Sequence, residues 1–261
     1  STIGSHGSLT VEQALMNSCN PYMIHLALEM GNSRFAYYQS LFGFGKITGI
    51  DLPGETTGIV YGDRMTTIDA ACNSFGQTIN VNMMQMMAAY CSIINGGMLY
   101  QPHIVKRIES ANGEVVKEYK ANLVRQTITA STSKLLRRYL KNTVEEGTAK
   151  KAGVTGYSVA GKTGTAQKGD RKDNKWIISF IGHAPAENPK FAIYVVIDEP
   201  YGTTGTSGSS ADVLTLTHNI LEKLLPYMNV YKDASDEYED TSSSPDELTV
   251  DGIPAGTASS N

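Results

Sequence analysis

Residues 159–166 read Val159-Ala160-Gly161-Lys162-Thr163-Gly164-Thr165-Ala166, and two different folds compete for them. From Gly156 to Thr163 the chain matches the G-x-x-x-x-G-K-[ST] pattern of phosphate-binding loops. Such a loop needs a strand before its first glycine and a helix that begins at the lysine. Residues 150–155 contain no apolar run, and the polar residues after Gly164 make a poor helix start. The stretch therefore predicts a strand, and a P-loop NTPase is disfavoured.

Three strand candidates lie in the second half of the chain, at residues 157–165, 176–182 and 191–198. Their links are short, polar and without helical periodicity, so consecutive strands should pair antiparallel. Helices are predicted for residues 10–16, 21–31, 81–95, 131–146 and 210–228. Asn112-Gly113 predicts a small surface hairpin between residues 104–108 and 115–119, and residues 42–62 form an irregular connection. The pattern predicts an α+β fold around an antiparallel sheet.

Composition narrows the possible functions. With 261 residues and 41% hydrophobic content, the chain can bury a sizeable core. A net charge of -4 gives no broad basic surface, so nucleic acid is not an expected partner. The three cysteines, Cys19, Cys72 and Cys91, form no C-x-x-C pair, and the five histidines lack a metal-binding spacing. We expect no metal and no cofactor.

The two ends of the chain differ from its middle. The start, Ser1-Thr2-Ile3-Gly4, has neither an initiator methionine nor a targeting signal, so we expect an excised piece of a longer protein. The most apolar stretch, Met83 to Ile94, is too short to span a membrane. From Lys232 onward the chain is rich in Asp, Glu, Ser and Thr. This composition predicts that residues 229–261 form a disordered acidic tail or linker.

Ser18-Cys19-Asn20 lies between two predicted helices. Residues i and i+2 point to the same side only where the chain is extended, so Ser18 and Asn20 can face one cavity only if the helix breaks there. Pro21 favours that break because it disfavours helical geometry at Asn20. A simpler interpretation is that Asn20 caps the second helix. Both interpretations stay open at the level of sequence.

A second serine motif, Ser131-Thr132-Ser133-Lys134, has the S-x-x-K form of an activated serine. On a helix, Ser131 and Lys134 share a face, so the lysine could deprotonate the hydroxyl. Hydroxyl residues directly before an amphipathic helix more often cap it. We therefore interpret these residues as a helix N-terminus.

The motifs S-x-x-K, S-D-N and K-T-G together are the known signature of penicillin-binding proteins and class A β-lactamases. Ser18-Cys19-Asn20 and Lys162-Thr163-Gly164 correspond to the second and third. Over nearly all of residues 6–226 the chain resembles class B penicillin-binding proteins, including the division and sporulation transpeptidases. The stretches that carry the resemblance lie at residues 6–7, 42–45, 48–55, 74–77, 95–97, 146–149, 159–166 and 180–182.

This resemblance implies an α+β fold of the penicillin-binding transpeptidase and serine β-lactamase type, with helices on both faces of the sheet. It implies a peptidoglycan D,D-transpeptidase that cross-links the cell wall through a serine acyl-enzyme and binds β-lactam antibiotics. The implied partners are stem peptides ending in D-Ala-D-Ala and other cell-wall synthesis proteins. The implied location is the extracytoplasmic face of the bacterial plasma membrane, with an N-terminal anchor outside this chain.

The resemblance also assigns roles to residues. Ser18 would relay a proton toward the leaving group, with Lys162 supplying positive charge beside it. Asn20 would hold the donor peptide's amide. Thr163 and Thr165 would bind the terminal carboxylate, and the backbone N–H of Thr165 would form half of an oxyanion hole. Gly164 lacks a side chain, which lets the opposite wall approach.

The nucleophile is the missing part. No serine before Ser18 has a lysine three residues later, so covalent acyl transfer has no first step in this chain. We therefore expect residues 1–228 to be the C-terminal portion of a transpeptidase domain, inactive alone. Two alternatives stay open: a non-catalytic pseudoenzyme that binds stem peptides, and a serine β-lactamase or β-lactam sensor.

Overall fold

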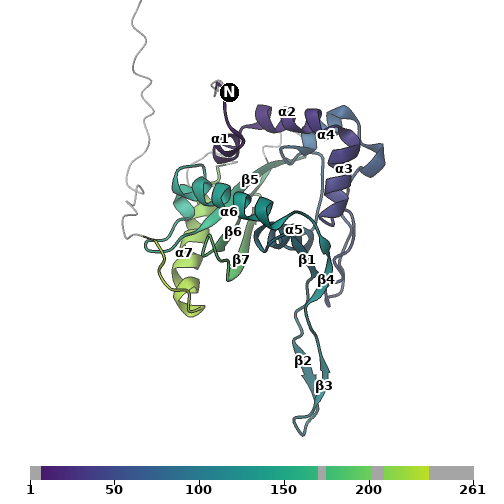
Figure 1. Cartoon of the computed structure of the whole chain (residues 1–261), viewed down its shortest axis with the longest axis vertical. Helices are drawn as coiled ribbons and strands as arrows, with labels where there is room; N and C mark the ends of the chain where they lie inside the picture. The colour runs from purple at the N-terminus through teal and green to yellow at the C-terminus, as the bar shows by residue number, and fades with distance from the viewer. Residues whose placement is uncertain (1–6, 170–174, 201–208, 235–261) are drawn as a thin grey trace, which may run out of the picture.

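A computed structural model describes residues 7–169, 175–200 and 209–234 (Figure 1). Its main sheet contains β5 (Ala160–Lys168), β6 (Lys175–Ala184) and β7 (Phe191–Asp198), all antiparallel in the order β5-β6-β7. The three predicted strands are confirmed, with β5 beginning at Ala160 rather than at Tyr157. Lys162 lies inside a strand and no helix begins at it, so the chain does not form a phosphate-binding loop.

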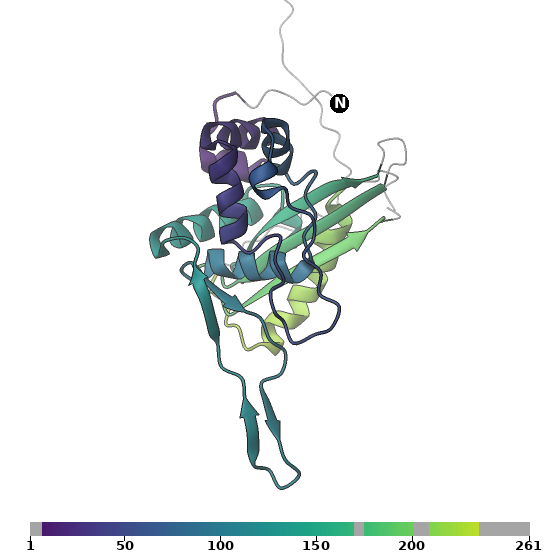
Figure 2. The same ribbon diagram turned by 90° about the vertical axis from the view of Figure 1, so that its right-hand side faces the viewer.

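Helices cover both faces of this sheet, as predicted. Figure 2 shows α5 (Met83–Ile94) and α6 (Ala130–Glu145) on one side and α7 (Ala211–Tyr227) on the other. Strand alternation separates the two layers. Ile178 and Phe180 of β6 are fully buried in the cluster that contains the α7 leucines, whereas Ile181 packs with Tyr90 of α5. Burying a side chain of this size contributes about 2 kcal/mol to stability.

The N-terminal part forms a helical cap above the edge of β5 (Figure 1). It contains α1 (Val11–Met16), α2 (Asn20–Met30), α3 (Asn32–Leu41), the 3-10 turn η1 (Gly62–Arg64) and α4 (Thr67–Asn73). A second 3-10 turn, η2 (Lys150–Ala152), lies outside the cap and follows α6. Neither α3 nor α4 was predicted. The apolar residues of α3 do not form a stripe, since Tyr37 and Tyr38 are exposed, and α4 is short, beginning at the Thr66–Asp69 capping box.

A long arm leaves the domain opposite the cap (Figures 1 and 2). At its base β1 (Met98–Gln101) pairs with β4 (Asn122–Gln126), and at its tip β2 (Arg107–Glu109) pairs with β3 (Val115–Glu118) around the predicted turn. Asp51, from the irregular connection, accepts hydrogen bonds from the N–H groups of Ile104 (2.7 Å) and Val105 (2.9 Å). These bonds lower the pKa of Asp51 and fix the arm to the domain.

The chain stays packed on the domain beyond α7. Val230 is buried, and the Asp233 carboxylate accepts a hydrogen bond from the Ser158 N–H (2.7 Å). Residues 229–234 of the predicted tail are thus ordered by contacts with the loop before β5, and the rest of that prediction falls outside the described residues. No described helix has the length and hydrophobicity needed to cross a membrane.

The turn between α5 and β1 supplies a test of the fold. Gly96 and Gly97 both have positive φ angles, +95° and +97°. A Cβ atom at Gly96 would meet nothing, whereas one at Gly97 would lie 1.9 Å from the Ile128 carbonyl oxygen. We expect Gly96→Ala to lower the free energy of unfolding by about 1 kcal/mol and Gly97→Ala by about 3 kcal/mol or more. Urea denaturation of both variants measures this, and equal losses would contradict the packing described.

Candidate active site

Ser18 is held where α1 ends. The Ser18 N–H donates to Leu15 O (3.2 Å) and the Cys19 N–H donates to Ala14 O (2.9 Å), which is the Schellman pattern of helix C-termini. Ser18 occupies the left-handed position of this motif with φ 49°, where glycine is usual. A serine there costs about 1–2 kcal/mol relative to glycine, and such strain is concentrated at functional sites. The turn projects the Ser18 side chain toward β5.

Lys162 reaches Ser18 from the edge of the sheet. Its Nζ donates to Ser18 Oγ, and it lies 3.3 Å from both Thr163 O and Thr163 Oγ1. The pairing of Lys162 with Ile181 places it on the sheet face that α5 and α6 cover. Burial disfavours the ammonium and lowers the pKa of Lys162 to about 8. Within the described part of the chain its partners are all neutral oxygens, so its charge is available to an anion.

A third element, the loop after α6, completes this cluster. Thr148 Oγ1 lies 3.4 Å from Ser18 Oγ and 3.4 Å from Thr163 Oγ1. The Thr148 N–H donates to Met16 O (3.2 Å) at the end of α1. A Cβ at the preceding Gly147 would lie 2.8 Å from the same oxygen, so only glycine permits this approach. Thr148 belongs to residues 146–149, one of the stretches that carry the family resemblance, and the sequence alone indicates no role for it.

Asn20 begins the second helix rather than capping it. It is the first residue of α2, and the N-cap is Cys19, so the capping interpretation is wrong. The break between the two helices covers residues 17–19, and the Schellman turn makes it rather than Pro21. The Asn20 side chain is exposed and forms no hydrogen bond within the described residues. It is thus free to bind a ligand.

Gly164 and Thr165 continue β5 beyond the cluster. A Cβ at Gly164 would lie 2.5 Å from Ser179 Oγ of β6, so the missing side chain leaves room for the Ser179 side chain. Thr165 is exposed and, in the described part of the chain, its hydroxyl has no hydrogen-bond partner. Among the residues described, β5 pairs only with β6, which leaves its other edge open. The structure therefore brings together Ser18, Lys162 and Thr163, and leaves Asn20 and Thr165 exposed.

The S-x-x-K sequence at Ser131 belongs to the far end of α6. Thr129 is the N-cap and accepts from the Thr132 N–H (3.2 Å), and Ser131 Oγ lies 2.9 Å from Thr129 Oγ1. Thr143, near the other end of α6, donates to Gly161 O beside Lys162. Thr143 lies twelve positions after Ser131 on this helix, a rise of about 18 Å. Ser131 is part of a helix N-terminus, as predicted, and lies away from the cluster.

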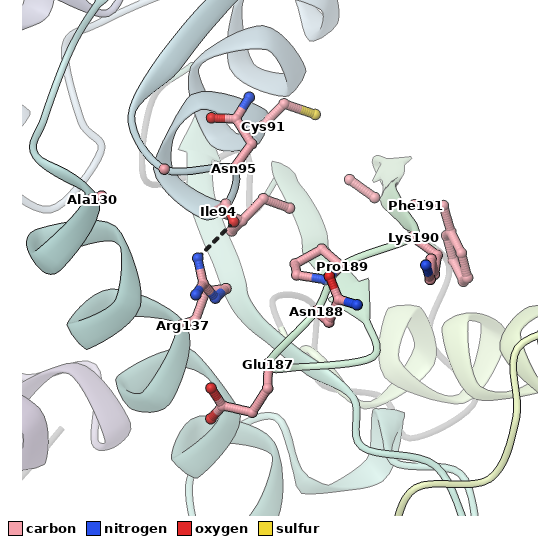
Figure 3. Close-up of a pocket in the computed structure, with 12 residues that line it drawn as sticks. Cys91, Ile94, Asn95, Ala130, Arg137, Glu187, Asn188, Pro189, Lys190 and Phe191 are labelled. Carbon is pink, nitrogen blue, oxygen red and sulfur yellow. Dashed lines mark hydrogen bonds between the residues drawn. The ribbon is translucent and has the colours of Figure 1, made fainter.

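A separate cavity of about 470 Å³ lies between α5, the start of α6 and the link between β6 and β7 (Figure 3). Arg137 borders it and donates to Ile94 O (2.9 Å), which ties α6 to the end of α5. None of the six predicted site residues lines this cavity. The candidate active site is therefore the edge of β5 beneath the helical cap.

Comparison with known proteins agrees with this geometry. Residues 2–222 match the penicillin binding protein transpeptidase domain model. The chain is 40% identical over 232 residues to stage V sporulation protein D of Bacillus subtilis, covering 87% of this chain and 36% of that protein. It is 32% identical over 238 residues to the peptidoglycan D,D-transpeptidase FtsI of Escherichia coli, covering 89% of this chain and 38% of FtsI. The chain thus spans little more than a third of these relatives.

Solved structures give the same result. Penicillin binding protein 3 of Mycobacterium tuberculosis in complex with ampicillin superposes with a TM-score of 0.78 at 30% identity, covering 87% of this chain and 53% of that one. The apo transpeptidase domain of Burkholderia pseudomallei penicillin-binding protein 3 has a TM-score of 0.77 at 26% identity, covering 89% and 68%. The resemblance to class B penicillin-binding proteins and the predicted fold class are confirmed. The chain belongs to the penicillin-binding protein transpeptidase domain family.

Proposed function

We propose that this chain forms the substrate-binding part of a peptidoglycan D,D-transpeptidase, a cell-wall cross-linking enzyme that works through a serine acyl-enzyme. The observation that carries the proposal is the contact between Lys162 Nζ and Ser18 Oγ beside an open strand edge. An ammonium next to a hydroxyl can give that hydroxyl a proton when the hydroxyl passes its own proton to a leaving group. Ser18 and Lys162 are thus the proposed catalytic residues of this chain.

The open edge of β5 suits a peptide substrate. An extended stem peptide can add to it as a further strand through main-chain hydrogen bonds. The Lys162 charge and the hydroxyls of Thr163 and Thr165 would then meet the terminal carboxylate of D-Ala-D-Ala, or the carboxylate of a β-lactam. Asn20 would hold the donor amide from the opposite wall. The backbone N–H of Thr165 would form half of the oxyanion hole, and a donor of that kind is worth about 3 kcal/mol in the transition state.

The acylated serine is proposed to come from outside these 261 residues. The relatives are much longer than the chain, and Ser131, the one serine here with a lysine three residues on, lies at the far end of α6. We accordingly propose that residues 1–228 are the C-terminal portion of the transpeptidase domain, inactive alone. The whole protein is proposed to act with other cell-wall synthesis proteins on the extracytoplasmic face of the plasma membrane, behind an N-terminal anchor.

Covalent labelling by a fluorescent penicillin tests this function. We expect the whole protein to be labelled and residues 1–261 alone to remain unlabelled. Lys162→Ala in the whole protein should slow labelling about 100-fold, because it removes the cation beside Ser18. Ser131→Ala is the matched control and should label at the normal rate.

Three results of this experiment would count against the proposal. A whole protein that binds stem peptide without being labelled would instead be a pseudoenzyme, and rapid hydrolysis of the bound penicillin would indicate a β-lactamase. Loss of label in Ser131→Ala would show that the helix N-terminus carries the nucleophile after all.

The pH dependence of acylation should report on Lys162. Since burial lowers its pKa to about 8, the ammonium loses its proton as the pH rises through that value, and the anion-binding charge disappears. We expect the second-order rate constant for acylation to fall above about pH 8. In Lys162→Arg the rate should be lower overall but without this fall, because a guanidinium stays charged. Persistence of the same alkaline limb in Lys162→Arg would assign it to another group.

A further inference from the structure

The hydroxyl of Thr148 closes a ring of four polar groups. Lys162 Nζ contacts Ser18 Oγ and Thr163 Oγ1, and each of these hydroxyls lies 3.4 Å from Thr148 Oγ1. The four groups come from three parts of the chain: the end of α1, the loop after α6, and β5. Thr148 is the member that touches both hydroxyls without touching the lysine.

Counting hydrogen atoms shows what Thr148 can do. A lysine ammonium has three donors and no acceptor, and the neighbours of Lys162 Nζ are Ser18 Oγ, Thr163 Oγ1 and Thr163 O. In the site without substrate, once the two hydroxyls accept from the ammonium, each must send its own proton elsewhere. Thr148 Oγ1 has two lone pairs and lies within reach of both. Its own O–H can then point into the cleft, because Thr148 is exposed.

We propose that Thr148 is a positioning residue of the transpeptidase site, whose hydroxyl orients Ser18 and Thr163 while Lys162 is charged. This inference rests on the proposed function and adds to it the residue that connects the two walls of the site. The backbone supports this role. The Thr148 N–H donates a hydrogen bond to Met16 O, and Gly147 allows close approach to α1. The loop is therefore fixed to the same helix end that carries Ser18.

The hydrogen bonds that Thr148 accepts matter more when Lys162 is charged than when it is neutral. With Lys162 charged, Ser18 and Thr163 depend on Thr148 as an acceptor. With Lys162 neutral, the Ser18 O–H can donate to Nζ instead, so Thr148 is not needed. Removing the Thr148 hydroxyl should consequently destabilise the charged state more than the neutral one. The pKa of Lys162 should fall, while a change that merely loosened the loop and admitted water would raise it.

Three variants test this. Thr148→Val removes the hydroxyl at nearly constant volume, Thr148→Ser keeps it, and Thr155→Val is the matched control, since Thr155 is exposed and its side chain bonds to no described residue. The readout is an NMR titration of the lysine ε-carbons, with the Lys162 signal assigned from Lys162→Arg. We expect the pKa of Lys162 to fall by about 0.5 in Thr148→Val and to be unchanged in Thr148→Ser and Thr155→Val.

Acylation of the whole protein by a fluorescent penicillin gives the second readout. Thr148→Val should be acylated about tenfold more slowly and Thr148→Ser at nearly the normal rate. An unchanged or raised Lys162 pKa in Thr148→Val, or failure of Thr148→Ser to restore both readouts, would overturn the inference. If the whole protein is never acylated, the proposed function fails, yet the titration still decides whether Thr148 orients the ring.

Discussion

The contact between Lys162 and Ser18 can form only if three elements meet at one point. Helix α1 must end in a turn that points Ser18 toward the sheet, and its Schellman bonds at Leu15 O and Ala14 O do this. Strand β5 must be at the edge of the sheet, since an inner strand would be flanked on both sides. The loop after α6 must pack closely against the end of α1, and Gly147 allows this because it has no side chain to meet Met16 O. The core between the sheet and α5, α6 and α7 fixes these three relative to one another.

The cost of this arrangement is local, whereas the stabilisation comes from elsewhere. Ser18 sits in a left-handed conformation that glycine would adopt more easily, and Lys162 is partly buried with no anionic partner among the described residues. Both features lower stability by an amount on the order of 1–3 kcal/mol each. Fully buried residues such as Phe180 and Leu221 lie in the adjoining core and offset it. Local strain that is held by a well-packed core is characteristic of a functional site.

Sequence patterns found the parts of this fold whose signals are local. The strand at Lys162 followed from the lack of any helix start after it, and the hairpin from Asn112-Gly113. Helix α3 was missed because its apolar residues form no stripe, and it is held instead by tertiary contacts such as the Gln39–Asn73 side-chain hydrogen bond (3.0 Å). Pro21 was given the role that the Ser18 turn performs, since a serine with positive φ has no sequence signal. Thr148 was missed because its partners lie 130 and 15 residues away.

The choice of hydroxyls rather than a carboxylate around Lys162 has an electrostatic reason. A carboxylate within a few ångströms would stabilise the ammonium and raise its pKa, but it would also cancel the charge that a substrate carboxylate must meet. Hydroxyls accept the lysine's hydrogen bonds and leave its net charge intact. Because the site is partly shielded from water, that charge acts at lower effective dielectric than on an open surface. Ser18 and Thr163 thus hold the ammonium in place while its charge stays available to an anion.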